Sequence, residues 1–176
     1  MEYNRIHIIG GPGSGKTFLA GALSKELSIP SHDLDDIFWA RNANDYHAKT
    51  PERERNELLV KIIREKQWIV EGVYYRWLNE AFEKSDLIVI LKTSALIRNW
   101  RITIRFIKRK LGIIEGKSEE LTDFIKLALW NTKFDADNMI RIEEHIKKYR
   151  SKIVEIKTKK ELQDFLEKVK REKRAN

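Results

Sequence analysis

A glycine-rich segment of eight residues constrains this chain more than any other part of the sequence. Residues 10–17 read GGPGSGKT, which fits the pattern G-x-x-x-x-G-K-[ST] of loops that wrap phosphate groups. The apolar run 5–9 before this loop is typical of a short strand, and residues 16–27 after it carry leucines at helical spacing. We therefore expect the loop to connect a strand to a helix, which is the setting in which such loops bind nucleotides.

Each residue type in the loop has a chemical reason. Glycines allow backbone N–H groups to turn toward phosphate oxygens, and the start of the following helix adds its dipole. Lys16 supplies a mobile positive charge for the β- and γ-phosphates, and the Thr17 hydroxyl can coordinate Mg²⁺. A glycine-rich turn with a chance lysine is the alternative, and the flanking elements argue against it. The predicted nucleotide-binding residues are Gly10, Gly11, Pro12, Gly13, Ser14, Gly15, Lys16 and Thr17.

Strand and helix patterns alternate along the rest of the chain. This alternation predicts a parallel sheet with helices on both faces, and 176 residues correspond to about one domain, here spanning 1–176. The predicted later strands are 28–32, 68–70, 87–91 and 152–157. The predicted later helices are 51–65, with Pro51 in its first turn, 75–83, 95–111, one or two within 118–148, and 159–172.

Composition excludes several classes of protein. The sequence has no cysteine, so a disulfide framework, a zinc–thiolate site, an iron–sulfur cluster and a cysteine nucleophile are all excluded. No apolar run approaches the roughly 18 residues of a membrane span, so we expect no membrane association and a cytoplasmic protein.

The net charge of +8 is unevenly distributed along the sequence. Residues 1–88 carry 12 basic and 14 acidic side chains, whereas residues 89–176 carry 23 basic and 13 acidic side chains. A basic half indicates an anionic partner such as phosphate, a nucleotide or nucleic acid. A solvated, lysine-rich surface is the alternative explanation.

Taken together, these segments resemble the adenylate kinase and shikimate kinase branch of P-loop proteins. More narrowly, the chain resembles the small kinase-like proteins called DNA topology modulation proteins (FlaR-like). The resemblance rests on GGPGSGKT at 10–17, HDLDDIFW at 32–39, WIVEG at 68–72, DLIVIL at 86–91, the arginine-bearing helix that follows, and the ending at 152–170. It implies a three-layer α/β P-loop NTPase fold with a five-stranded parallel sheet in the order 2-3-1-4-5. It also implies an acceptor-binding insert at about 33–66 and an arginine-bearing lid at about 95–120.

The resemblance assigns roles to two acidic residues near the second strand. Asp33 and Asp35 match a D-x-D pattern in which the first acid lies near Mg²⁺ and the second contacts the phosphoryl acceptor. In an extended backbone, residues two apart point to the same side, so we expect both carboxylates to face the site while Asp36 points away. Asp35 is then a candidate base for an acceptor hydroxyl. Solvated acids that open a helix are the alternative.

A second pair of residues follows the third strand. Glu71 and Gly72 occupy the place of an Asp-Gly pair, which implies that Glu71 orders Mg²⁺ through water and that Gly72 lets substrate approach the backbone. Glu71 is one methylene longer than that aspartate. Arg76 lies one residue after the position at which the kinases that this chain resembles carry an arginine that binds acceptor phosphate. A surface role for Arg76 is the alternative.

The predicted helix 95–111 carries a basic stripe beside an apolar stripe. The resemblance implies that its arginines neutralise the transferring phosphoryl group, and we select Arg101 and Arg105 for this role. A solvated basic face is the alternative. We expect Trp100 to pack in the core, and Gly112 and Gly116 are candidate hinges of the lid. Phe38, Trp39, Tyr46, Tyr74 and Tyr75 lie near the predicted acceptor site, where they pack in the core or stack on a base.

These observations predict a phosphotransferase that moves the γ-phosphate of ATP, with Mg²⁺, to a small acceptor. The acceptor is a nucleoside, a nucleotide or another small hydroxyl compound, and the sequence does not distinguish among them. The protein is expected to be a monomer or a homodimer. The alternative function is a nucleotide-dependent regulator that binds DNA. The sequence contains no recognisable helix-turn-helix or zinc finger, and lid arginines explain the same basic charge.

Overall fold

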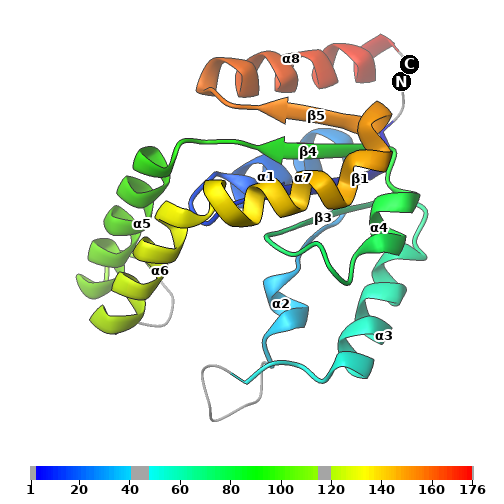
Figure 1. Ribbon diagram of the computed structural model, residues 1–176. Coiled ribbons are helices and arrows are strands. Elements are labelled where there is room, and N and C mark those ends of the chain that lie inside the picture. Colours follow the sequence, from blue (N-terminus) through cyan, green and yellow to red (C-terminus); the bar gives the residue numbers. More distant parts are fainter. Residues whose placement is uncertain (1–2, 41–47, 115–119, 176) are drawn as a thin grey trace.

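The computed structural model describes residues 3–40, 48–114 and 120–175 (Figure 1). Within them, five parallel strands form one sheet in the order β2-β3-β1-β4-β5, as the sequence predicts. The strands are β1 (Arg5–Gly10), β2 (Ser31–Asp33), β3 (Trp68–Gly72), β4 (Leu87–Leu91) and β5 (Ile153–Ile156).

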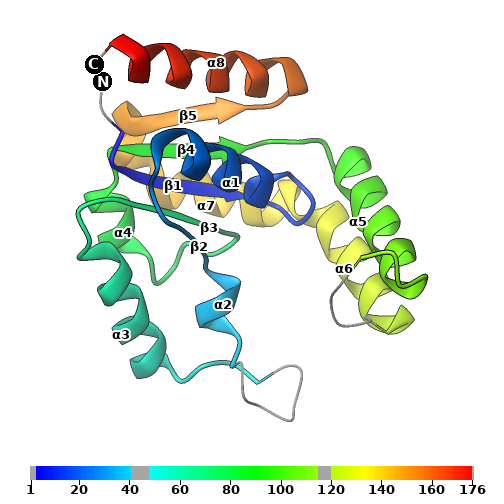
Figure 2. The same ribbon diagram turned by 180° about the vertical axis from the view of Figure 1, so that it is seen from behind.

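Helices cover both faces of this sheet and give the predicted three layers (Figures 1 and 2). The helices are α1 (Lys16–Leu27), α2 (Asp35–Phe38), α3 (Glu52–Ile63), α4 (Asn79–Lys84), α5 (Ala95–Lys110), α6 (Leu121–Lys133), α7 (Ile140–Ile146) and α8 (Lys159–Ala175). A π-helical turn, η1 (Asp135–Met139), joins α6 to α7, and a 3₁₀ segment, η2 (Lys147–Lys152), precedes β5. Helices α1 and α8 bury their apolar sides against one face, and α3, α4 and α7 against the other. No helix in the described part of the chain is long and apolar enough to cross a membrane.

The three central strands β3, β1 and β4 are mostly apolar and are buried beyond Arg5, because both of their faces are covered. Their register determines where the site forms. Ile8 of β1 pairs with Glu71 of β3, and Ile9 pairs with Gly72. The carboxyl end of β3 therefore lies beside the loop that follows β1, so the fold brings Glu71 to residues 10–17.

Several helix boundaries differ from the prediction. Helix α4 begins at Asn79 rather than 75, because the aromatic residues Tyr74 and Trp77 pack against Phe38 in a loop instead of continuing the helix. Pro51 precedes α3 with ψ of 142°, outside the helical region, so the helix starts one residue later than expected.

The core position predicted for Trp100 is wrong. Its side chain is 66% exposed, and the side of α5 that packs inward carries Arg98 and Ile102 instead. Helices α5 and α6 lie beyond the carboxyl ends of the strands (Figure 1), so α5 packs mainly on α6 and on the glycine-rich loop. The apolar stripe that includes Trp100 consequently lies on the outer side of α5.

Candidate phosphotransfer site

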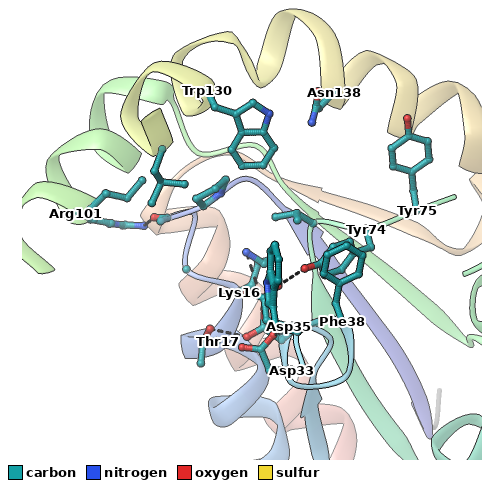
Figure 3. A pocket seen from close by; sticks show the side chains of 18 of the residues that line it. Lys16, Thr17, Asp33, Asp35, Phe38, Tyr74, Tyr75, Arg101, Trp130 and Asn138 are labelled. Atoms are coloured by element: carbon teal, nitrogen blue, oxygen red, sulfur yellow. Dashed lines mark hydrogen bonds and ion pairs between the residues drawn. The ribbon is translucent and has the colours of Figure 1, made fainter. Parts of the chain in front are cut away.

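A cavity of about 840 Å³ opens at the carboxyl ends of the strands, where α/β sheets bind their ligands (Figure 3). Residues from the glycine-rich loop, the ends of β2 and β3, the loop before α4, and helices α5 and α6 line it. The predicted site residues in this lining are Pro12, Gly13, Gly15, Lys16, Thr17, Asp33, Asp35, Glu71, Arg76, Arg101 and Arg105. The structure therefore brings the predicted phosphate, metal, acceptor and lid residues together around one space.

The glycine-rich loop has the backbone that a phosphate cradle needs. Gly13 and Gly15 have φ angles of +72° and +103°, which residues with a side chain rarely adopt. The Ser14 N–H donates to the Gly11 carbonyl at 3.2 Å and closes the turn. A Cβ on Gly13 would lie 2.7 Å from the carbonyl oxygen of Arg98, so only glycine fits there. Lys16 then begins α1 and points into the cavity (Figure 3).

Lys16, Thr17 and Glu71 form a compact polar cluster. The Thr17 hydroxyl donates to Glu71 Oε1 at 2.5 Å, and Lys16 Nζ lies 4.0 Å from Glu71 Oε2. Lys16 Nζ also donates to the Gly11 carbonyl at 3.3 Å. Burial lowers the pKa of Lys16 and raises the pKa of Glu71, and the opposite charge of each partner reduces both shifts.

Asp33 and Asp35 both line the cavity, as expected, but the backbone that places them there is not the extended one that was predicted. Strand β2 ends at Asp33 and α2 begins at Asp35, so the extended backbone predicted here is wrong. The Asp33 carboxylate accepts the Asp35 N–H at 2.9 Å, which places both side chains on the cavity side (Figure 3). Burial, followed by the charge of Glu71, raises the pKa of Asp33 to about 6. Asp35 Oδ1 accepts a 2.6 Å hydrogen bond from the Tyr74 hydroxyl.

The donor atoms around Thr17 suit a hard cation. The Thr17 hydroxyl and the Asp33 carboxylate offer oxygen atoms, the ligands that Mg²⁺ prefers, and the Glu71 carboxylate accepts from Thr17 at a place where it can bond a metal-bound water. Among residues 3–40, 48–114 and 120–175, no group of three or more His, Asp or Glu side chains is arranged to hold a metal alone. These residues therefore fit a cation that takes its remaining ligands from phosphate oxygens and water.

The two selected lid arginines both line the cavity. Arg101 Nη1 donates to the carbonyls of Gly13 and Ser14, each at 3.1 Å, which attaches α5 to the glycine-rich loop. The positive charge of Arg105 contributes, after burial and in the same direction, to the lowered pKa of Lys16. The guanidinium groups therefore lie on the phosphate side of the cavity.

Sequence reasoning missed the role of Arg98. Its guanidinium is fully buried and donates to the Thr93 carbonyl at 2.6 Å, to Asp135 Oδ1 at 2.7 Å, and to Asn131 Oδ1 and the Asn131 carbonyl, each at 2.9 Å. These contacts join the start of α5 to α6 and η1, directly behind the loop glycines.

Gly112 follows α5 with φ of +66°, and Gly116, the second hinge candidate, lies outside the described residues. Movement of the lid stays a prediction.

Two predicted acceptor residues have surroundings that the sequence did not indicate. Gly72 lies behind the cavity, where a Cβ would come within 3.0 Å of Leu34, so close packing explains the glycine. Arg76 lies at the rim with its side chain exposed, and its Nε donates to the Tyr75 hydroxyl at 3.3 Å. The acceptor contacts predicted for both residues remain predictions.

The cavity also has an aromatic side that the sequence indicated only in part. Phe38, Trp39, Tyr74 and Tyr75 line it, so stacking on a base stays a prediction, and Tyr46 lies outside the described residues. Three further lining residues, Trp77, Trp130 and Asn138, had no sequence signal that pointed to them.

Comparisons by sequence find one curated relative. No family model matches the chain. The uncharacterized protein YqaC of Bacillus subtilis (strain 168) is 35% identical over 106 residues, which cover 59% of this chain and 57% of that protein. The chain therefore spans little more than half the length of this relative.

Two solved structures extend over nearly the whole chain. Shikimate kinase from Bacteroides thetaiotaomicron superimposes with a TM-score of 0.52 and 18% identity, covering 97% of this chain and 98% of that one. Shikimate kinase from Acinetobacter baumannii in complex with shikimate gives a TM-score of 0.58 at 18% identity, covering 95% and 90%. With the strand order and the glycine-rich loop, these similarities establish the P-loop kinase fold.

Proposed function

We propose that this protein is an ATP-dependent phosphotransferase that acts on a small molecule carrying a hydroxyl group. The observation that supports it best is that the phosphate cradle around Lys16 and the free side of Asp35 face the same cavity. A donor phosphate and an acceptor hydroxyl bound there would lie next to one another, and proximity of this kind is the largest requirement of phosphoryl transfer.

The loop residues Gly10–Thr17 hold the phosphates through their backbone N–H groups, and Lys16 neutralises charge on the β- and γ-phosphates. Mg²⁺ held by Thr17, with Asp33 and Glu71 as further oxygen donors, would supply positive charge to the same phosphates when bound. Arg101 and Arg105 approach from α5 and stabilise the negative charge of the transferring group.

The acceptor half of the site orients the hydroxyl. Asp35 accepts the hydrogen bond of that hydroxyl, and Tyr74, which donates to the other side of the same carboxylate, holds Asp35 in place. The acceptor oxygen forms a new bond to the γ-phosphorus while the bond from this phosphorus to the β,γ-bridging oxygen breaks. ADP leaves with that electron pair, and the hydroxyl proton passes to Asp35. Arg76 lies at the rim of the acceptor end.

The alternative function, a nucleotide-dependent DNA-binding regulator of the topology modulation kind, has weaker support. Two of the basic side chains that suggested it, Arg101 and Arg105, line the cavity, and Arg98 is fully buried. Duplex DNA binding with a steep salt dependence and no phosphorylated product would favour this alternative.

The Lys16→Ala variant tests the proposal. It should weaken ATP binding or abolish γ-phosphoryl transfer while leaving the thermal unfolding profile close to that of the parent, because the ion pair of Lys16 with Glu71 is long, at 4.0 Å, and Glu71 keeps its hydrogen bond from Thr17. Lys66→Ala is the matched control, since Lys66 is exposed and precedes β3 at the opposite end of the sheet. ATP affinity is measured by calorimetry and transfer by mass spectrometry. Unchanged ATP affinity and transfer in Lys16→Ala would refute the proposed function.

A further inference from the structure

The side of the cavity beside Asp35 is an aromatic wall. The rings of Phe38, from α2, and Tyr74, from the loop after β3, stack with centroids 4.4 Å apart at 27°. Trp77 extends the cluster, 5.6 Å from Tyr74 and 6.5 Å from Phe38. Tyr74 is also the residue that donates to Asp35, so the aromatic wall and the proposed base are directly joined (Figure 3). An acceptor whose hydroxyl meets Asp35 has its body against these rings.

The opposite side of the cavity carries Trp130 and Asn138, which come from α6 and from the π-helical turn η1 (Figure 3). Short π segments within helices occur frequently at functional sites, and this one presents Asn138 to the cavity. The side chain of Asn138 has no hydrogen-bond partner among the described residues. Its amide offers one acceptor and two donor hydrogens, the combination that pairs with the edge of a nucleobase.

The charges around the cavity disfavour an anionic acceptor. The carboxylates of Asp33, Asp35 and Glu71 all line it, whereas Lys16, Arg101 and Arg105 lie on the phosphate side. Of the described lining residues at the aromatic end, Arg76 carries the positive charge, and it is fully exposed over the Tyr75 ring. A largely buried cation, Arg55 of α3, lies over the Trp77 ring at 4.6 Å, but it pairs with Glu52 at 3.7 Å and is not among the residues that line the cavity. Outside the phosphate side, the lining thus carries carboxylates and one exposed cation, and burying a phosphate or carboxylate there is costly.

We propose that the acceptor is a nucleoside: a neutral molecule with a planar heteroaromatic base and a sugar hydroxyl. The base lies between the Phe38–Tyr74 wall and Trp130, its hydrogen-bonding edge meets Asn138, and the hydroxyl meets Asp35. This inference rests on the proposed function and names its substrate class. A cationic amino alcohol would satisfy the carboxylates but would leave the Asn138 amide unused. A hydroxy acid could accept from the Asn138 amide, but its negative charge would be repelled by the carboxylates of the lining.

A phosphorylation panel tests the substrate class. The parent protein is incubated with ATP and Mg²⁺ and with the common ribo- and deoxyribonucleosides, their 5′-monophosphates, shikimate as the hydroxy acid, and choline as the amino alcohol. Products are identified by mass. At least one nucleoside should react with a kcat/KM at least about 10-fold above those of its monophosphate, shikimate and choline, given the value of one good base contact. A preference for any of the other three classes, or no transfer to any nucleoside, overturns the inference.

Variants of Asn138 test the base contact. Asn138→Ala should raise the KM for the preferred nucleoside by about 10- to 100-fold, the usual value of a paired base edge, with kcat and ATP affinity nearly unchanged. Asn138→Asp exchanges donors for acceptors and should change which base is preferred. Asn56→Ala, on the exposed surface of α3, is the control. Equal KM values in Asn138→Ala and the parent would contradict the placement of the base.

The two proposals fail in distinguishable ways. If the parent and Lys16→Ala bind ATP and transfer phosphate equally well, the proposed phosphotransferase function itself is refuted. Lys16-dependent transfer to shikimate or choline, with nucleosides inert, would leave the phosphotransferase standing and refute only the nucleoside acceptor.

Discussion

The Thr17 hydroxyl of α1 donates a hydrogen bond of 2.5 Å to Glu71 Oε1 at the end of β3. The pairing of Ile8 with Glu71 in the sheet brings the two elements together, and the length of the glutamate side chain lets its carboxylate reach the hydroxyl directly. The residue proposed to hold Mg²⁺ is therefore oriented by the carboxylate proposed to assist it, in the manner of an outer ligand that fixes an inner one.

Glu71→Gln should weaken the dependence of the reaction on Mg²⁺. The amide keeps the shape of the side chain but removes its negative charge. That charge strengthens the hydrogen bond from the Thr17 hydroxyl and attracts Lys16. We expect the Mg²⁺ concentration for half-maximal transfer to rise by about 10- to 100-fold, the usual effect of losing an outer-ligand partner. The measurement is a Mg²⁺ titration of transfer at saturating ATP, with Glu57→Gln on the exposed side of α3 as control. Coincident titration curves for Glu71→Gln and the parent would exclude the role.

Arg98→Met should destabilise the protein substantially. The substitution leaves Asn131 and Asp135 without the guanidinium that bonds both, and removes the guanidinium that packs behind Gly11. We expect a loss of about 3 kcal/mol in the free energy of unfolding, because the side-chain and backbone oxygens of the fully buried Asn131 lose their donor, whereas the half-exposed Asp135 gains water. Urea unfolding measures it, and Lys108→Met on the exposed side of α5 should change stability by less than about 0.5 kcal/mol. Equal losses in the two variants would show that the buried network contributes little.

Much of the fold was predictable because it depends on local patterns. The apolar runs predicted the central strands, and the spacing of residues 10–17 identified the loop together with its lysine and threonine. Asp33 and Asp35 were predicted to share one side of an extended chain, whereas a hydrogen bond at the start of α2 produces the same outcome.

The unpredicted features depend on contacts between distant residues. Arg98 belongs to the basic stripe of its helix, and only its partners Asn131 and Asp135, 33 and 37 residues away, make its burial favourable. Asn138 reaches the cavity because a π-helical turn changes the direction of side chains between α6 and α7. Sequence periodicity assumes a regular helix and cannot indicate such a turn.

His7 should make the stability of the protein dependent on pH. It is fully buried in β1, stacks on Phe82 at 4.3 Å, and its two ring nitrogens have no partner among the described residues. Burial lowers its pKa from 6.5 to about 3. The unfolded chain therefore takes up a proton first as the pH falls below 6.5, so the stability present at neutral pH is lost toward pH 3.

The predicted size of this effect is about 2 kcal/mol of unfolding free energy lost between pH 7 and pH 5. His7→Phe keeps an aromatic ring on Phe82, removes the buried nitrogens, and should abolish that part of the pH dependence. Urea unfolding of both proteins at the two pH values measures the difference. Parallel losses in His7→Phe and the parent would assign the pH dependence to other groups.

Asp35→Asn should separate chemistry from ATP binding. The amide keeps the size of the side chain and can still accept the hydrogen bond of Tyr74, but it cannot take the proton of an acceptor hydroxyl. We expect transfer to fall by about 10²- to 10⁴-fold, the usual effect of losing a positioned base. ATP affinity should change little, because the glycine-rich loop and Lys16 hold the phosphates. Asp36→Asn, one residue further on in the exposed first turn of α2, is the control and should keep most of its activity. If instead Asp36→Asn lost transfer and Asp35→Asn kept it, the acceptor hydroxyl would lie at Asp36. That result would contradict both Asp35 as the base and the position of the acceptor against the aromatic wall that Tyr74 joins to Asp35.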